Sequence, residues 1–285
     1  MLNSKLTSLV STHKIVKVME LSSIGKLKKM NNQAEYAQRY YAAIFESMTQ
    51  LKHLLRSYEE NKTGKAVIVL ISSSQGFCGG YNAEVFRQVD SLKKTIPLDQ
   101  EVSYIVIGNK GVQYLQKDNV QEVKYYEESL EELNYSFSRK FVDNFFEEVI
   151  SGEIHSLHVV YTHYESPTAY QAKAQKLFPV SQELFNVKEK INLEFLEYEE
   201  KDKDVIPMLL HNYLVSAFYS CFILSVASEL TQRRITMHAA RKNLEDEIEE
   251  RKIFEKKMRR EHELNELIDI IGSSRVMRGE TEIGK

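Results

Sequence analysis

The 285-residue chain contains no tryptophan and only two cysteines, Cys78 and Cys221. These cysteines lie far apart, and neither belongs to a CxxC pair or to a Cys/His ligand set, which argues against a disulfide framework or a zinc site. Reduced thiols in a cytosolic protein are the simpler interpretation. The formal net charge is only −3, with charges of both signs, so bulk charge gives no argument for a nucleic-acid or membrane-surface partner.

Long uninterrupted apolar runs are also missing. The N-terminus lacks the unbroken apolar core of a secretory signal. The most apolar stretch, residues 208–227, is interrupted by His211, Asn212, Ser216 and Ser220, so we do not expect it to span a membrane. The sequence predicts a soluble, cytosolic protein that can still be attached to a membrane complex.

Proline and glycine are scarce towards both ends of the chain. All four prolines lie between residues 97 and 207, residues 1–60 contain only Gly25, and residues 208–271 contain neither residue type. Because these residues cost a helix interior about 1 to 3 kcal/mol each, their absence favours two very long helices. We expect helices over 1–62 and 205–273, a stop at Gly272-Ser273-Ser274, and a flexible tail over 274–285.

The N-terminal helix has seam residues at alternating three- and four-residue spacing, which is typical of a left-handed coiled coil. They are Leu6, Leu9, His13, Val16, Glu20, Ser23, Leu27, Met30, Ala34, Ala37, Tyr41, Ile44, Met48, Leu51, Leu55 and Tyr58. His13, Glu20 and Ser23 are polar, and we expect no strong core at that end. The C-terminal helix carries seams from Leu210 to His238 and, after a register slip, from Leu244 to Ile271. The two patterns predict antiparallel pairing, with the C-terminal end extending past its partner.

Between the helices, strand and helix signals alternate. Strands are expected at 65–71, 103–108, 123–126 and 157–163, helices at 82–94, after 110 and at 138–150, and edge strands at 177–180 and 191–195. This alternation predicts a small, mostly parallel open sheet in a Rossmann-like α/β domain over residues 63–200. The predicted fold class is therefore α/β plus a long antiparallel α-helical coiled coil.

No segment carries a recognisable catalytic, cofactor-binding or metal-binding pattern. The loop after the first expected strand fits neither G-x-x-x-x-G-K-[ST] nor G-x-G-x-x-G, so we interpret Gly76, Gly79 and Gly80 as structural turn residues. His155 and His163 share strand parity but are about 26 Å apart at strand rise, too far to share a metal. We therefore expect no cofactor, and no chemistry performed by this chain alone.

The C-terminal helix interleaves cationic and acidic residues, and two interpretations are open. Its basic residues are Arg233, Arg234, Arg241, Lys242, Arg251, Lys252, Lys256, Lys257, Arg259 and Arg260. They could pair with glutamates one turn away on a solvated helix. Alternatively, they could form cationic bands that meet acidic loops on surrounding subunits.

Three segments, in order, resemble one family. Residues 11–21 and 25–29 resemble its N-terminal signature, N-T-x-K-I-T-K-A-M-x-M-V followed by K-L-R-K. Residues 76–82 resemble its G-L-C-G-G-x-N. Residues 225–229, with Arg233, Met237, Ala240 and Asn243, resemble its S-L-A-S-E-x-x-x-R-M-x-A-M-x-x-A-x-x-N. The chain is thereby similar, over essentially its whole length, to the gamma subunit of F-type ATP synthases.

The resemblance implies a non-catalytic central rotor shaft that couples ATP hydrolysis or synthesis in a hexamer of alpha- and beta-type subunits to rotation and proton translocation. It implies hexamer contacts for Lys14, Lys17, Met19, Arg233, Arg241, Arg259 and Arg260. Tyr198 and Glu199 would contact the foot, where an epsilon-type subunit and a membrane rotor ring, or a replacement adaptor, would bind. The resemblance implies no nucleic-acid partner, and a cytoplasmic location peripheral to the cell membrane.

The chain departs from the family pattern at several places. Charged residues 200–203 replace the prolines that usually follow the Tyr-Glu pair, and Gly25 places a glycine inside the first helix. Glu263-Leu264 replaces Ile-Thr, and residues 274–285 extend past the usual end. These departures favour a divergent paralogue whose shaft drives a non-proton output. Two other classes remain open. A free-standing coiled-coil scaffold would be stable alone and self-associate, whereas a nucleotide-binding regulator would bind ATP alone.

Overall fold

The computed structural model describes residues 2–50, 64–97, 99–117, 120, 123–126, 128, 132–166, 169–180 and 205–282. The chain divides into two compact units, the first formed by Met1–Glu20 with Met237–Lys285 and the second by Leu21–Thr236. Two long helices, α1 (Leu2–Gln50) and α7 (Val205–Glu282), each contribute residues to both units. The two long helices predicted from the scarcity of glycine and proline are confirmed.

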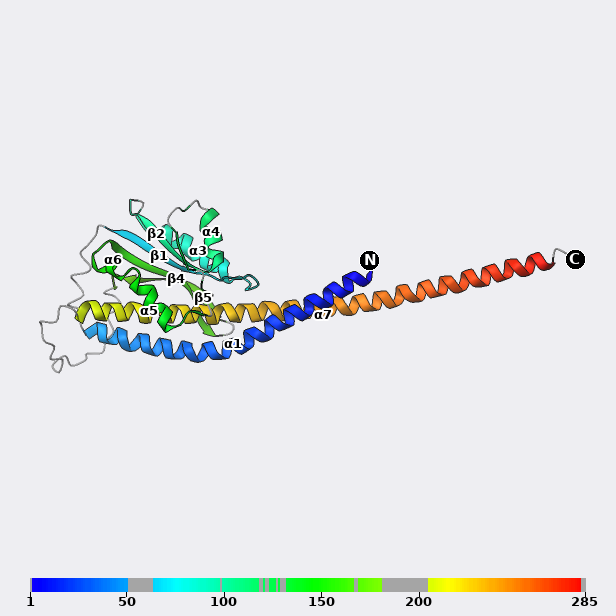
Figure 1. Cartoon of the computed structure of the whole chain (residues 1–285), viewed down its shortest axis with the longest axis horizontal. Coiled ribbons are helices and arrows are strands. Elements are labelled where there is room, and N and C mark those ends of the chain that lie inside the picture. The colour runs from blue at the N-terminus through cyan, green and yellow to red at the C-terminus, as the bar shows by residue number, and fades with distance from the viewer. Residues whose placement is uncertain are drawn as a thin grey trace. The chain divides into compact units, whose positions relative to one another are not determined.

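The second unit contains a five-stranded sheet with the order β3-β2-β1-β4-β5 (Figure 1). Its strands are β1 (Lys65–Ile71), β2 (Val102–Ile107), β3 (Val123–Tyr126), β4 (Ile154–Ser166) and β5 (Ala169–Phe178). All neighbours are parallel except β5, which runs antiparallel to β4. The mostly parallel open sheet is therefore confirmed, and β1, apolar from Ala66 to Ile71, lies at its centre.

Two sequence-based boundaries need correction. The edge strand expected at 177–180 is the end of a longer strand, β5, whose alternation of alanine with glutamine and lysine gave little strand signal. The helix expected at 138–150 is two helices, α5 (Tyr135–Asp143) and α6 (Phe146–Ile150), because Phe145 leaves the helical conformation with a φ of −136°. The other expected edge strand, 191–195, lies outside the described residues.

Helices cover both faces of the sheet. The helices α3 (Tyr81–Lys93) and α4 (Asn109–Lys117) pack on one face with Ile68 and Leu70 of β1. On the other face, Val67 and Val69 belong to a larger cluster with α1, α5 and α7 (Figure 1). Because residues of α1 and α7 complete this core, the parts of these helices within residues 21–236 belong to the same compact unit as the sheet. The predicted boundaries near 62 and 200 lie in segments outside the described residues.

The most apolar part of α7 belongs to this core. Phe218 and Phe222 are fully buried, and their rings lie 5.1 and 5.6 Å from that of Phe141 on α5. By length and composition, α7 contains a window apolar enough to cross a membrane, but 94% of that window is buried inside the protein. The apolar surface is therefore used for packing against the sheet and α1.

The predicted seam of α1 is confirmed along its described length. Each described seam position from Leu6 to Met48 is buried or half-buried. The predicted helix stop at Gly272 was wrong, because α7 continues to Glu282 through part of the segment expected to be a flexible tail. Gly25 lies inside α1, as expected. A glycine costs a helix about 1 kcal/mol, which a helix of this length tolerates.

Candidate functional site

The place to look for a ligand in an open α/β sheet is the crevice outside the carboxyl ends of the strands, where the strand order reverses. In this sheet the reversal lies between β1 and β4, since the chain proceeds from β1 to β2 and β3 on one side before β4 pairs on the other. Two segments border the crevice, namely residues 72–80 after β1 and the part of β4 around Thr162.

Side chains of α7 occupy this crevice. The amide of Thr162 donates to Ser225 Oγ at 3.3 Å, and Ser228 Oγ donates to the Thr162 carbonyl at 3.3 Å. The pairing of β1 with β4 ends at Leu70 and Val160, so Thr162 lies beyond its reach. The two serines thus satisfy backbone groups that a neighbouring strand would otherwise pair.

A buried ion pair lies one and two turns further along α7. Glu229 and Arg233 are 4% and 8% exposed and form a short salt bridge with each other. The Arg233 guanidinium also donates to the carbonyl of Gly76 in the loop after β1, at 3.4 Å. Arg233 was predicted to contact a partner subunit. The structure instead assigns its charge to the interior, because a buried guanidinium requires a carboxylate and a hydrogen-bond acceptor nearby.

The loop after β1 has its own internal hydrogen bonds. The side chain of Asn82 accepts from the Ser73 amide at 3.0 Å and donates to Ser73 Oγ at 2.7 Å. Phe77, at the tip, has a φ of 64°, rare for a residue with a side chain, and is 67% exposed. The loop is therefore ordered from within as well as held by Arg233.

The three glycines of this loop differ. Gly79 has a φ of +56°, and a Cβ there would lie 2.9 Å from Thr236 Oγ1 of α7, so a side chain would be strained and crowded. Gly76 and Gly80 have no positive φ, and a Cβ on either would meet no described atom within 4 Å. The conformation requires glycine at Gly79 but not at Gly76 or Gly80.

A hollow of about 340 Å³ lies at the opposite, amino ends of the strands. Lys65, Tyr104, Lys124 and Glu148 are among its lining residues. Lys65 Nζ lies 2.8 Å from Glu148 Oε2, and this contact raises the pKa of Lys65. Within the described part of the chain, no group of three or more His, Cys, Asp or Glu side chains could hold a metal ion.

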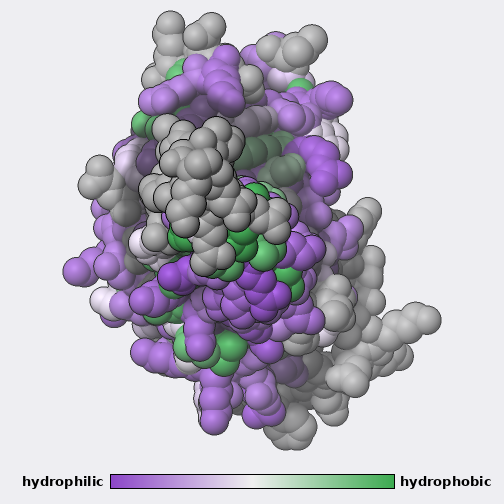
Figure 2. Space-filling model, turned by 90° about the vertical axis from the view of Figure 1, so that its right-hand side faces the viewer, coloured by the Kyte–Doolittle hydropathy of each residue, from purple (hydrophilic) through white to green (hydrophobic). Residues whose placement is uncertain are grey.

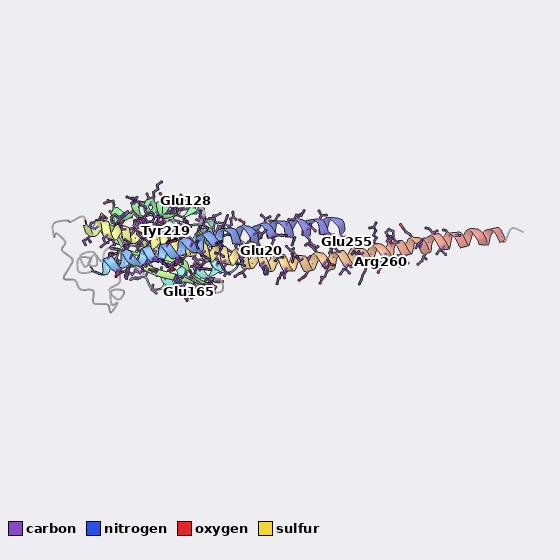
Figure 3. All side chains as sticks on the ribbon, turned by 90° about the horizontal axis from the view of Figure 1, so that it is seen from below. Glu20, Glu128, Glu165, Tyr219, Glu255 and Arg260 are labelled. Atoms are coloured by element: carbon purple, nitrogen blue, oxygen red, sulfur yellow. The ribbon has the colours of Figure 1, made fainter. Side chains whose placement is uncertain are left out.

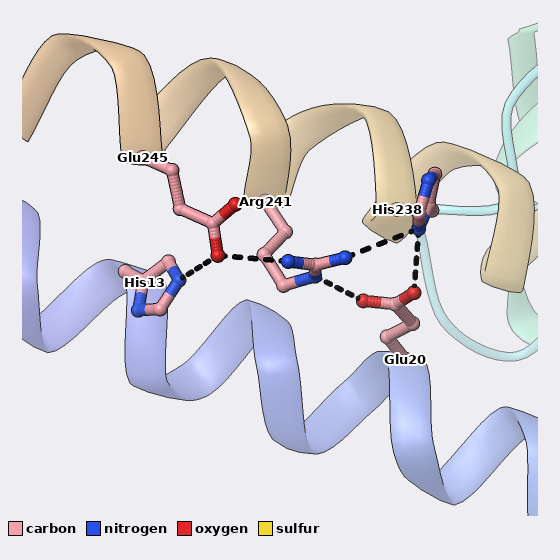
Figure 4. Close-up of polar contacts among 5 residues, drawn as sticks. All are labelled: His13, Glu20, His238, Arg241 and Glu245. Atoms are coloured by element: carbon pink, nitrogen blue, oxygen red, sulfur yellow. Dashed lines mark hydrogen bonds and ion pairs between the residues drawn. The ribbon is translucent and has the colours of Figure 1, made fainter.

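In the first unit, α1 and α7 are joined by an ion-pair network of five residues (Figure 4). Arg241 lies at its centre, donating through Nε to Glu20 Oε2 and through Nη1 to Glu245 Oε1, both at 2.7 Å. His238 Nδ1 lies 2.8 Å from Glu20 Oε1, and His13 Nε2 lies 3.1 Å from Glu245 Oε1. These contacts join lower-numbered residues of α1 to higher-numbered residues of α7, as antiparallel pairing requires.

The electrostatics of the network centre on Glu20, which is 8% exposed. Burial raises the pKa of Glu20, but hydrogen bonds from His238 and Arg241 outweigh this effect and leave the pKa below its ordinary value. The polar seam positions His13 and Glu20 therefore belong to a specific set of contacts, where we expected only a weak core. Arg241 has intrachain partners in this network, and its contact with a partner subunit stays a prediction.

The remaining predicted contact residues lie at the surface or outside the described segments. Lys14 and Lys17 are exposed and Met19 is half-buried. The Arg259 side chain is 84% exposed beside Glu263, 3.5 Å away, and Arg260 is exposed on α7 (Figure 3). Tyr198 and Glu199 lie outside the described residues.

The same part of α7 exposes large apolar side chains. They are Ile253, Phe254, Met258, Leu264, Leu267, Ile268, Ile270 and Ile271, each 45–63% exposed. Figure 2 shows a face with small hydrophobic patches among predominantly hydrophilic residues. A helix with exposed apolar residues beside exposed arginines is suited to contact another protein surface.

Comparison with known proteins identifies the family. A family model described as ATP synthase matches residues 1–277. The chain belongs to this family. Its curated relatives include ATP synthase gamma chains of Buchnera aphidicola, 26% identical over 96% of both chains, and Halothermothrix orenii, 26% identical over 96% of this chain and 97% of the relative. The gamma chain of Mycoplasma mobile is 27% identical over 99% and 98% of the two chains.

Solved structures of the family share the fold. A chain of the Euglena gracilis mitochondrial ATP synthase, in a structure of OSCP, F1 and the c-ring, matches with a TM-score of 0.68 at 15% identity, covering 100% of this chain and 96% of that one. A chain of the Tetrahymena thermophila central stalk and c-ring matches with a TM-score of 0.59 at 19% identity, over 79% and 99%. Like these ATP synthase chains, the protein combines long terminal helices with a mostly parallel sheet.

Proposed function

We propose that this chain is the central shaft of an F-type rotary ATPase. ATP turnover in a surrounding hexamer of alpha- and beta-type subunits would drive, or be driven by, its rotation. The observation that carries the proposal is the match to ATP synthase gamma chains along nearly the full length of both sequences. The antiparallel contacts of α1 with α7 and the exposed apolar residues of α7 fit a shaft surrounded by other subunits.

The chain would take no part in ATP chemistry. The crevice where an open α/β sheet commonly binds a ligand is filled by Ser225, Ser228, Glu229 and Arg233 of α7. ATP hydrolysis and synthesis would then occur on the partner subunits. We expect the purified chain to show neither ATP hydrolysis nor ATP binding in a calorimetric titration. Binding to the isolated chain would favour a nucleotide-binding regulator instead.

The surface residues supply the partner contacts in this proposal. Lys14, Lys17 and Met19 on α1, with Arg259 and Arg260 on α7, would meet acidic loops of the hexamer. Residues around Tyr198 and Glu199 would face an epsilon-type subunit and a membrane rotor ring, or an adaptor in its place. The protein would then be cytoplasmic, and peripheral to the membrane through its complex.

Purification of the native complex through a tag on this chain tests the proposal. We expect alpha- and beta-type ATPase subunits to co-purify in an active complex. A stable, self-associated chain without them would favour the coiled-coil scaffold. The identity of the co-purified subunits that bind at the foot, around Tyr198 and Glu199, distinguishes two versions of the shaft function. A proton-conducting ring with an epsilon-type subunit indicates the ordinary output, and unfamiliar foot subunits indicate the divergent one.

A further inference from the structure

One face of α7 is bonded to the α/β domain over about three turns. Ser225, Ser228, Glu229, Arg233 and Thr236 follow one another at short spacings that place them on the same side of the helix. The first four make the polar contacts to Thr162, to each other and to the loop carbonyl described above. Thr236 lies so near Gly79 that a Cβ at this glycine would be 2.9 Å from Thr236 Oγ1. We refer to these five residues as the α7 polar face.

The chemistry of this face differs from that of the rest of the contact. Apolar packing, such as that of Phe218 and Phe222 on Phe141, is non-directional. Hydrogen bonds and ion pairs weaken steeply with misalignment, so they resist rotation of a helix about its own axis. A buried ion pair adds little net stability over an apolar pair of similar volume. The Glu229–Arg233 pair itself lies within α7, and what it supplies beyond packing is to hold the Arg233 guanidinium where it donates to the Gly76 carbonyl. This bond, with those of Ser225 and Ser228 to Thr162, gives α7 a fixed angle relative to the sheet and the loop after β1.

The position of the α7 polar face along the chain bears on how torque passes from α7 to the α/β domain. The second unit ends at Thr236, and the first unit contains α7 from Met237 onward. Torque that travels along α7 from beyond Met237 therefore reaches the α/β domain first at the polar face. We propose that this face is a torsional clamp, in which Glu229 and Arg233 are positioning residues that transmit rotation of α7 to the α/β domain. The proposal rests on the shaft function proposed above.

The test separates torsional coupling from stability. In the assembled complex with its hexamer immobilised, a probe is attached through a Lys94→Cys substitution on the exposed surface of the α/β domain; the native Cys78 and Cys221 are buried. The first variant, Glu229→Met with Arg233→Met, replaces the pair by apolar side chains of similar volume, which preserves packing. The second, Ser225→Ala with Ser228→Ala, removes two hydroxyl groups and little volume. The matched control is Leu115→Val, a buried change in the core on the opposite face of the sheet.

We expect each clamp variant to hydrolyse ATP at the wild-type rate while the angular distribution of the domain-bound probe widens at every dwell. The control should keep the wild-type angular width even where its melting temperature is lower. Clamp variants that keep the wild-type width would overturn the clamp while leaving the shaft function intact. A wild-type complex whose probe never rotates during ATP hydrolysis would refute the shaft function, and with it the clamp.

Discussion

Gly79 lies in the loop after β1, beside Thr236 of α7. Its φ of +56° opposes a side chain, and so does Thr236 Oγ1, which would lie only 2.9 Å from a Cβ at this position. The neighbouring Gly80, which precedes α3, has a φ of −79° and an open surrounding among the described residues. Two adjacent glycines with the same sequence signal therefore differ in what they contribute.

We expect Gly79→Ala to lower the free energy of unfolding by about 1 to 3 kcal/mol, since left-handed backbone and crowding both oppose the methyl group. The matched control Gly80→Ala should be close to neutral, because its backbone already lies in a region that alanine prefers. Urea unfolding of the two variants measures the difference. Equal losses at both positions would contradict the role assigned to Gly79.

His158 on β4 gives the second unit a dependence on pH. Burial, with a smaller contribution from the neighbouring charge of Lys176, lowers the pKa of His158 from 6.5 to about 4. Below pH 6.5 the unfolded chain takes up a proton at this residue while the folded chain does not. Stability therefore falls as the pH drops from 6.5 towards 4, by an amount on the order of 2 to 3 kcal/mol.

The variant His158→Gln removes this titration. We expect its unfolding free energy to change less than that of the wild type between pH 7 and pH 4.5, whatever its absolute level. Urea titrations at several pH values give the two slopes. The same pH slope in both proteins would show that His158 does not carry the effect.

At the scale of single elements, the pairing of α1 with α7 in the first unit depends on Glu20. Its carboxylate accepts hydrogen bonds from Arg241 and faces His238, with both neighbours on α7. Because its folded pKa is lowered, this carboxylate stabilises the pair above its unfolded pKa and loses that contribution as the pH falls through the folded value.

We expect Glu20→Gln to weaken amide protection in α1 around residues 13–24 and in α7 around 235–246, as measured by hydrogen exchange. The control is Glu35→Gln, which removes a carboxylate paired with Arg39 on the exposed surface of α1. Exposed pairs of that kind contribute about 0 to 1 kcal/mol, so protection there should hardly change. Protection around Glu20 that survives the substitution would mean that apolar contacts alone hold the two helices.

The elements that the sequence predicted well are those with a strong local pattern. The apolar run of β1 and the seam of α1 report burial directly, because a side chain repeats on one face at a fixed period. The small alanines of β5 give a weak strand signal, which pairing with β4 overrode. The glycine at 272 did not end α7, because one glycine costs a helix only about 1 kcal/mol.

The candidate site was less predictable because its partners are distant in sequence. Arg233 contacts the carbonyl of a residue 157 positions earlier, and Arg241 contacts Glu20 across 221 positions. A single sequence gives the charge of an arginine, but it does not show whether the side chain contacts its own chain or a partner subunit. For both residues the only local sign of an intrachain contact is a carboxylate one turn away on the same helix, Glu229 for Arg233 and Glu245 for Arg241.

At the scale of the whole molecule, Arg259 and Arg260, exposed on α7, provide a test of whether this helix contacts other subunits. Arg259→Glu with Arg260→Glu should weaken assembly with the hexamer by about tenfold or more, since like charges placed opposite each other in an interface cost several kcal/mol. The control Lys94→Glu with Lys117→Glu makes the same change of charge on exposed lysines of the α/β domain. Binding of the purified hexamer to each variant measures the effect. Unchanged affinity of the arginine variant would indicate that Arg259 and Arg260 face solvent and do not contact the hexamer.

The order in which the ribosome makes the chain has a consequence for its biosynthesis. Strands β1, β2 and β4 leave the ribosome before α7, whose segment Leu210–Leu230 fills the core on one face of the sheet. Until that segment emerges, apolar side chains of a nascent sheet stay open to solvent and to other chains, the condition under which newly made proteins aggregate or engage chaperones. A messenger truncated before codon 205 should therefore yield an insoluble or chaperone-bound product, even though every strand of the sheet has been translated.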